Sequence, residues 1–149
     1  MSVYLVVKFV HILVAVIAVG SSAGSSFWLR LAARSPQHLP FALRSAKRLD
    51  EFLTRPGLIV IAGTGLWMAA SRWTLTALWI RSAVVLVVVV LALLYTVVGP
   101  LLGRLINLID REESGTPTWT RTELLFEVVG GGSGLIVVVI LGLMVFKPS

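Results

Sequence analysis

The sequence predicts an all-α integral membrane protein, an antiparallel bundle of four transmembrane helices with a short interfacial helix before the second span. The first observation behind this prediction is composition: of 149 residues, 57% are hydrophobic and only 13% are charged. A soluble domain usually carries about a quarter charged residues, so the chain has too few for a water-facing surface. The second observation is that four apolar segments reach the roughly 20 residues needed to cross a bilayer. We therefore expect a single transmembrane domain over residues 1–149.

The four spans are expected at about residues 3–31, 53–70, 75–102 and 123–146. The first is interpreted as a retained span, because its only early cation, Lys8, lies inside a long apolar run, whereas a signal peptide has its cations first and a short apolar core. The third span is apolar on every side, as lipid requires. Its β-branched residues disfavour a helix in water, but a lone strand would leave its backbone groups unpaired in hydrocarbon.

Three features divide the chain between the spans. Residues 40–53 place apolar residues at helical spacing with basic residues between them, which is typical of an interfacial helix. The sequence RPG at Arg55–Gly57 is expected to begin or kink the second span. Pro100 removes one backbone hydrogen bond late in the third span and is expected to bend it.

Cation placement predicts the orientation in a bacterial inner (cytoplasmic) membrane. Nine cations lie on the first loop and the third connection, namely Arg30, Arg34, Arg44, Lys47, Arg48, Arg55, Arg104, Arg111 and Arg121. Four lie on the other side, namely Lys8, Arg72, Arg81 and Lys147. Cytoplasmic loops carry an excess of cations, so both termini are predicted to face outward. Trp67, Trp73 and Trp79 would then form an outer aromatic belt.

Charge and composition also narrow the function. The net charge of +6 arises from basic residues between apolar spans, which suits an anionic membrane surface, so the lipid bilayer rather than a nucleic acid is the expected partner. The absence of cysteine excludes disulfides, thiolate metal sites and cysteine catalysis. The sequence has no phosphate-binding loop, no paired carboxylates within a span and no serine nucleophile with a plausible base. No catalytic residue is therefore predicted.

Two ionisable residues, Lys8 and His11, lie one helical turn apart in the first apolar run. Lys8 is nearer the membrane surface and is interpreted as an interfacial anchor. His11 is deeper, and an ionisable residue within a span is a candidate for function. Three interpretations remain open for His11: a hydrogen bond to a neighbouring helix, ligation of haem or another metal, and proton handling. Met68, expected at a similar depth, is either a second haem ligand or a packing residue.

Two stretches are rich in small residues, GSSAGSS at positions 20–26 and FEVVGGGSG at positions 126–134. The first and fourth spans run antiparallel, so the stretches are expected at overlapping depths. Small residues let membrane helices approach closely. Helix packing is therefore predicted at Gly20, Gly24, Gly130, Gly131 and Gly134. The alternative is a small cavity lined by hydroxyl groups and exposed backbone.

The depth of Glu127 in the membrane bears on the cavity alternative, because a carboxyl group inside the span would be one of its polar groups. If the fourth span begins near Trp119, Glu127 lies about two turns inside it and level with Ser22. A protonated Glu127 would then donate a hydrogen bond to Ser22 or Ser25. If the span begins later, Glu127 is interfacial.

Three segments carry a resemblance to a known family: YLVVKFVHILVAV, RPGLIVIAGTGLWMA and LWIRSAVVLVVVVLALLYTVVGPLLGRL. The chain resembles, over about residues 4–108, the predicted integral membrane proteins of domain-of-unknown-function family 2269. The Lys-x-x-His opening and the Gly-Pro-Leu of the third span are the most distinctive parts. The opening is also similar to that of the copper resistance protein D-like membrane domain and of HemJ-type protoporphyrinogen oxidases. The second likeness implies that His11 is a haem ligand, although this chain has no second histidine within a span.

Three functional hypotheses follow. The first is a non-catalytic component or accessory subunit of a larger membrane complex, assembled with other membrane subunits or as a homo-oligomer. The second is a haem b-binding redox protein with His11 as axial ligand. The third is a small proton-coupled transporter that uses Glu127 or His11. Transporters of this kind often contain inverted repeats, and the two halves of the sequence show no convincing similarity.

Overall fold

Four long helices make up the structure, a computed structural model that describes residues 2–72 and 77–146. The first is α1 (Val3–Ala32) and the last is α6 (Pro117–Phe146). Between them, two helices are each built from three consecutive elements. These are α2 (Leu39–Leu49), η1 (Asp50–Thr54) and α3 (Arg55–Arg72), followed by α4 (Leu78–Leu93), η2 (Leu94–Val98) and α5 (Gly99–Asp110). All four long helices are long and apolar enough to cross a membrane, which confirms the predicted fold class.

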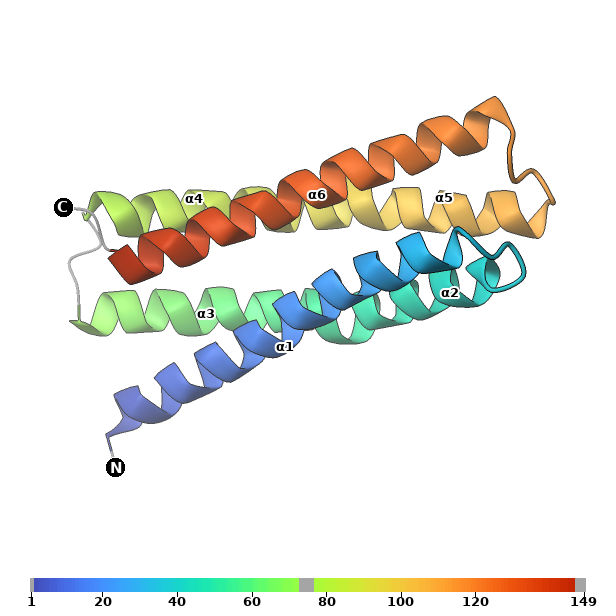
Figure 1. Cartoon of the computed structure of the whole chain (residues 1–149). Coiled ribbons are helices and arrows are strands. Elements are labelled where there is room, and N and C mark those ends of the chain that lie inside the picture. Colours follow the sequence, from blue (N-terminus) through green and yellow to red (C-terminus); the bar gives the residue numbers. More distant parts are fainter. Residues whose placement is uncertain (1, 73–76, 147–149) are drawn as a thin grey trace.

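The helices form two layers (Figure 1). Helices α1 and α6 lie across the two composite helices; α1 packs on α3 and α2, and α6 packs on α4 and α5. The composite helices contact each other through α2 with α5 and through α3 with α4. At one end of the bundle, here called the loop end, the end of α1 meets the start of α2, and the end of α5 meets the start of α6. The start of α1 and the end of α6 lie at the opposite end, here called the termini end.

Both composite helices contain a π-helical segment just before a proline. The backbone N–H of Arg55 donates to the carbonyl of Asp50, and that of Gly99 donates to the carbonyl of Leu94. Each hydrogen bond spans five residues, which widens the turn. A proline ring clashes with the carbonyl four residues before it. The wider turns lie where Pro56 and Pro100 would otherwise create that clash, so the helices continue through both prolines.

This continuity refines the predicted boundaries. Helix α2 occupies the segment predicted as an interfacial helix, but it runs on through η1 into the second span without a break. Helix α6 begins at Pro117 rather than near position 123. Trp73 and Lys147, which were part of the predicted aromatic belt and cation count, lie outside the described residues.

Helix length places the loop end relative to a bilayer. The composite helices have 34 and 33 residues, or about 50 Å each at about 1.5 Å per residue. The hydrocarbon core is about 30 Å thick, and α3 alone, with 18 residues, covers about 27 Å. Helices α2 and α5 therefore extend beyond the core, and η1 and η2 lie near its boundary.

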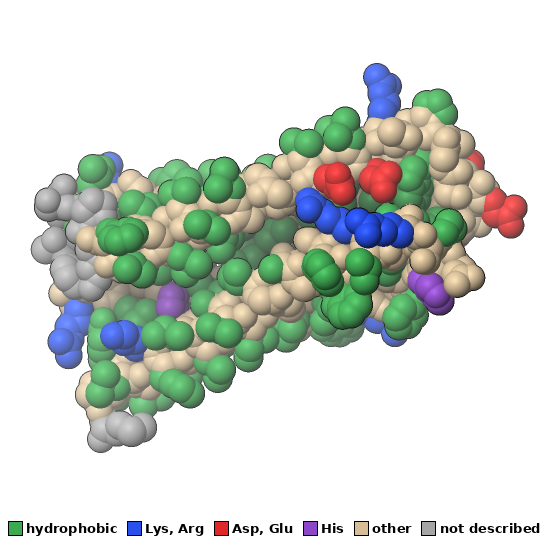
Figure 2. Space-filling model, in the orientation of Figure 1, with side chains coloured by type: hydrophobic (Ala, Val, Ile, Leu, Met, Phe, Trp, Pro, Cys, Tyr) green, Lys and Arg blue, Asp and Glu red, His purple; other side chains and the backbone are tan. Residues whose placement is uncertain are grey.

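The surface agrees with this placement. In the most apolar stretch of each long helix, no more than 17% of the residues are buried, so most apolar side chains face outward, where lipid would contact them. On the face shown in Figure 2, acidic side chains gather at the loop end, whereas the surface between the two ends is largely hydrophobic. At the termini end, the Arg72 guanidinium lies 4.6 Å from the centre of the Tyr4 ring, which also contacts Trp67. Such aromatic residues are typical of a membrane interface.

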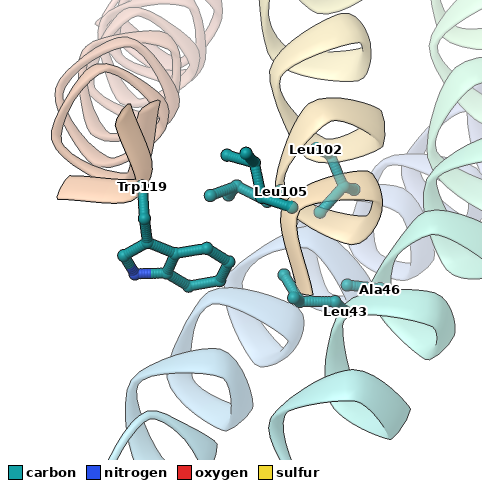
Figure 3. Close-up of a cluster of buried hydrophobic side chains, with 6 residues drawn as sticks. Leu43, Ala46, Leu102, Leu105 and Trp119 are labelled. Atoms are coloured by element: carbon teal, nitrogen blue, oxygen red, sulfur yellow. The ribbon is translucent and has the colours of Figure 1, made fainter. Parts of the chain in front are cut away.

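Two clusters of buried side chains hold the layers together. The first lies at the loop end, where α2, α5 and α6 meet; Figure 3 shows the Trp119 indole facing Leu105 and Leu43. The second lies deeper, around Leu58, Val90 and Ile140. Because lipid is as apolar as the side chains of the second cluster, close packing rather than exclusion from water stabilises the contacts of that cluster.

Candidate functional site

His11 is buried between α1 and α3. Its side chain is only 8% exposed, and its Nδ1 lies 2.8 Å from Oγ1 of Thr64. Gly65 makes room for the ring, because a Cβ at that position would lie 3.1 Å from Cε1 of His11. The first of the three interpretations, a hydrogen bond to a neighbouring helix, therefore describes one of the two ring nitrogens.

The hydrogen bonds of Thr64 indicate which nitrogen of His11 carries the proton. The Thr64 hydroxyl lies 2.6 Å from the carbonyl oxygen of Val60, and its single proton is donated there. Its oxygen is then the acceptor for His11, so Nδ1–H is the donor. In a neutral imidazole the lone pair is consequently on Nε2.

The two residues predicted beside His11 occupy different positions. Met68 is partly buried on α3, one turn beyond Thr64 toward the termini end, and its place as a haem ligand stays a prediction. Lys8 is exposed on α1, as an interfacial anchor would be. In the part of the chain that the structure describes, no group of three or more His, Asp or Glu side chains is arranged to hold a metal ion.

The glycines of the small-residue stretches make no close contact within the chain. A Cβ added at any of the five glycines named above would meet no atom within 4 Å outside its own stretch of helix. The prediction of helix packing at these glycines stays a prediction.

Glu127 faces a different partner from the one predicted. Its carboxylate lies 4.0 Å from the guanidinium of Arg30, and both side chains are at least half exposed. Ser22 is exposed, and its backbone carbonyl accepts a hydrogen bond from Ser26. The expected pairing with Ser22 is absent from the described residues, because α1 and α6 approach each other about two turns nearer the loop end. Although α6 starts early enough to place Glu127 well inside it, the residue lies beside a cation.

A second polar cluster is formed by Asp50 and Arg55. The Arg55 Nε donates to the Asp50 carboxylate at 2.7 Å, and their side chains are only 21% and 14% exposed. Residues five apart point in different directions on an α-helix, which turns about 100° per residue. The π-helical turn of η1 brings the two side chains together, so the same backbone feature that accommodates Pro56 also builds the ion pair.

The Arg55 guanidinium reaches the other composite helix. Its central carbon lies 4.9 Å from the centre of the Tyr95 ring, a cation–π contact. It also fills the space beside Gly99, where an added Cβ would overlap the guanidinium. Arg55 therefore links the end of η1 to both ends of η2.

Comparison with known families adds one finding. The family model described as predicted integral membrane protein (DUF2269) matches residues 5–148. The chain belongs to this family. No curated protein and no solved structure is significantly similar to it.

In this member of the family, two groups were not found from the sequence. Thr64 was not identified as the partner of His11, although its position on the face of the helix that carries Met68 was a usable signal. The cluster of Asp50, Arg55, Tyr95 and Gly99 was missed because it depends on two π-helical turns. The sequence did contain two signals of this cluster. Asp50 lies five residues before Arg55, and the next span contains the pair Gly99-Pro100.

Proposed function

We propose that the protein is a non-catalytic component of a larger membrane complex. One observation carries the proposal: every glycine of the two small-residue stretches has open space beside it within this chain. Glycine weakens a helix relative to alanine by about 1 kcal/mol. Gly130, Gly131 and Gly132 in succession are therefore costly unless a close contact makes use of them.

A second helix outside the chain would supply that contact. Membrane helices associate through small residues because these let the backbones approach. The glycines of both stretches lie on the termini side of the ion pair between Arg30 and Glu127. They offer two separate places where a partner helix would pack, from another subunit or from a second copy.

Co-purification from native membranes tests this proposal. Gly24→Leu and Gly131→Leu are expected to retain the fold, because a Cβ added at either position meets no other atom within 4 Å. They would block a close helix contact at a cost of about 1–3 kcal/mol, which lowers the affinity for the partner by roughly 5- to 150-fold.

Gly63→Leu is the matched control. Gly63 is an exposed glycine on α3 with the same open space, outside both stretches. It is expected to retain the partner. A native protein that elutes as a monomer with no stoichiometric partner would contradict the proposal.

A second candidate function is haem b binding through His11. The hydrogen bond from Nδ1 to Thr64 favours it, because it leaves the Nε2 lone pair for a metal and fixes the ring. When bound, haem would supply one-electron redox chemistry. In this candidate the chain positions the ring and excludes water, since the His11 side chain is nearly buried.

An absorption spectrum of protein purified from haem-replete cells tests this candidate. A Soret band that His11→Ala abolishes and Thr64→Val shifts is expected. Met68→Leu would lower the affinity only if Met68 is the second ligand. A colourless native protein would refute haem binding.

We also propose that the loop end faces the cytoplasm, for the reason given by the cation count. The chain lacks cysteine, so a single introduced thiol reports its own side. In intact cells, Ser35→Cys should resist a membrane-impermeant thiol reagent, and Ser2→Cys should react. The reverse pattern would invert the proposed orientation.

A further inference from the structure

A groove of about 530 Å³ lies between the loop-end part of α1 and helix α2. Its walls are mainly apolar and include Trp28, Ala32, Phe41, Ala42 and Leu49. Trp28 and Phe41 are 64% and 75% exposed, so they form open walls rather than a closed core. The groove runs along α2 from His38 to Leu49, so its inner end is next to η1, near the boundary of the hydrocarbon core.

Polar groups occur at the same groove. Ser35, His38 and Ser45 line it together with the apolar side chains. Hydroxyl and imidazole groups donate hydrogen bonds to phosphate oxygens. The groove thus combines walls suited to an acyl chain with donors suited to a headgroup.

The charges around the groove are not balanced within the protein. Four of the six cations of the first loop have acidic partners: Arg30 with Glu127, Arg44 with Asp110, Lys47 with Glu51, and Arg55 with Asp50. Among the described residues, the remaining two, Arg34 and Arg48, have no acidic group within 4.0 Å.

Neither arginine lines the groove itself, but each is next to a residue that does. Arg34 immediately precedes Ser35, which lines it. Arg48 lies on the flank of α2 that carries Phe41, because seven residues are nearly two helical turns, and it is three residues beyond Ser45. Two cations without acidic partners among the described residues are therefore next to groove-lining residues, one at each end of α2.

We propose that this groove binds an anionic phospholipid, with an acyl chain along Trp28 and Phe41 and the phosphate near Arg34 and Arg48. Basic pockets between membrane helices bind anionic headgroups in this way. The charge complementarity favours an anionic lipid over a neutral one of the same chain length. The inference does not depend on whether the protein has a protein partner.

Native mass spectrometry of the full chain in detergent tests the proposal. The protein is titrated with dioleoyl phosphatidylglycerol and, separately, with dioleoyl phosphatidylcholine. The native chain should bind the anionic lipid more than tenfold more tightly. Arg34→Gln and Arg48→Gln should each reduce this preference by roughly fivefold, and the double variant should nearly abolish it.

Arg111→Gln/Arg121→Gln is the matched control. It removes the same charge from the other connection at the loop end, one arginine after α5 and one on α6, and should leave the preference unchanged. An equal loss in both double variants would mean that general surface charge attracts the lipid, which would overturn the proposal. So would an unchanged preference in Arg34→Gln/Arg48→Gln.

Filling the groove provides an independent arm. Ala42→Trp should reduce retention of both lipids severalfold, because the walls rather than the charges hold the acyl chain. Circular dichroism unchanged from the native protein confirms that this variant is folded. Retention of both lipids at native levels in a folded Ala42→Trp variant would place the lipid elsewhere and refute the site.

Discussion

The two π-helical segments accommodate the same kind of interruption with different side chains. In both cases one residue separates the π-helical segment from the proline that follows it. Both segments lie about three turns from the loop end of their helix. Around η1 the chain places a largely buried ion pair, Asp50 with Arg55. Around η2 the buried side chains are apolar, Leu94 and Val98.

The difference shows that the segment around η1 supplies a charged side chain, and the segment around η2 supplies the space that this side chain fills. Arg55 at the end of η1 lies over Tyr95 and against Gly99, which belong to η2 and to the residue after it. A π-helical turn thus does more than tolerate a proline here. It directs the Arg55 side chain toward the neighbouring composite helix, where Gly99 leaves room for the guanidinium.

The largest expected effect comes from breaking the ion pair at η1. Asp50→Ala leaves Arg55 largely buried without its partner, and we expect a loss of about 3 kcal/mol in the free energy of unfolding. Unfolding by sodium dodecyl sulfate in mixed micelles, followed by circular dichroism, measures it. Glu51→Ala is the control, because its pair with Lys47 is 45% exposed on both sides and is worth less than about 1 kcal/mol. Equal losses would show that Asp50 is no more than a surface charge.

A smaller effect is expected from the glycines near the prolines. A Cβ on Gly57 would lie 2.9 Å from Cβ of Ala18 on α1, so Gly57→Ala should destabilise the protein by about 1–2 kcal/mol. Gly103, in the helix after η2, has open space, and Gly103→Ala should stabilise the protein by up to about 1 kcal/mol. The same unfolding assay compares them. If the two variants behave alike, close packing of α1 on α3 is not limiting.

The smallest effect is expected at Tyr95. Tyr95→Leu removes the ring beneath Arg55 and should cost about 0.5–1 kcal/mol. Tyr95→Phe retains the ring and should cost less than half of that. In the Asp50→Ala background, Tyr95→Leu should have a different effect, because Arg55 is no longer fixed. Additive losses would mean that Tyr95 and Arg55 act independently.

The four spans could be predicted from the sequence because lipid imposes length and apolar composition directly. The prolines also indicated that the regular helix would be interrupted at Arg55–Gly57 and at Pro100. What could not be predicted is that the chain would widen its turns there instead of breaking. An interior π-helical turn depends on how neighbouring helices re-satisfy the backbone, and no local pattern encodes that.

The candidate site was predictable in its depth and less so in its partners. His11 stood out because ionisable residues are rare inside spans. Its partner Thr64 depends on the rotation of α3 against α1, which Gly57 and Gly65 set through close contacts. Glu127 was placed by counting residues from the helix ends, and counting could not account for the relative tilt of α1 and α6, which brings Arg30 to it.

The overhang of the composite helices has a consequence for what approaches the loop end from water. Connections 33–38 and 111–116 are short, and they are joined to α2 and α5, which continue as α-helices beyond the hydrocarbon boundary. A protease or a soluble domain that approached this end would contact helices rather than long loops. The ion pair of Arg44 and Asp110 and the Trp119 cluster hold these helices together. The surface that the protein exposes to water at this end is therefore formed mainly by packed helix ends, with only short connections between them.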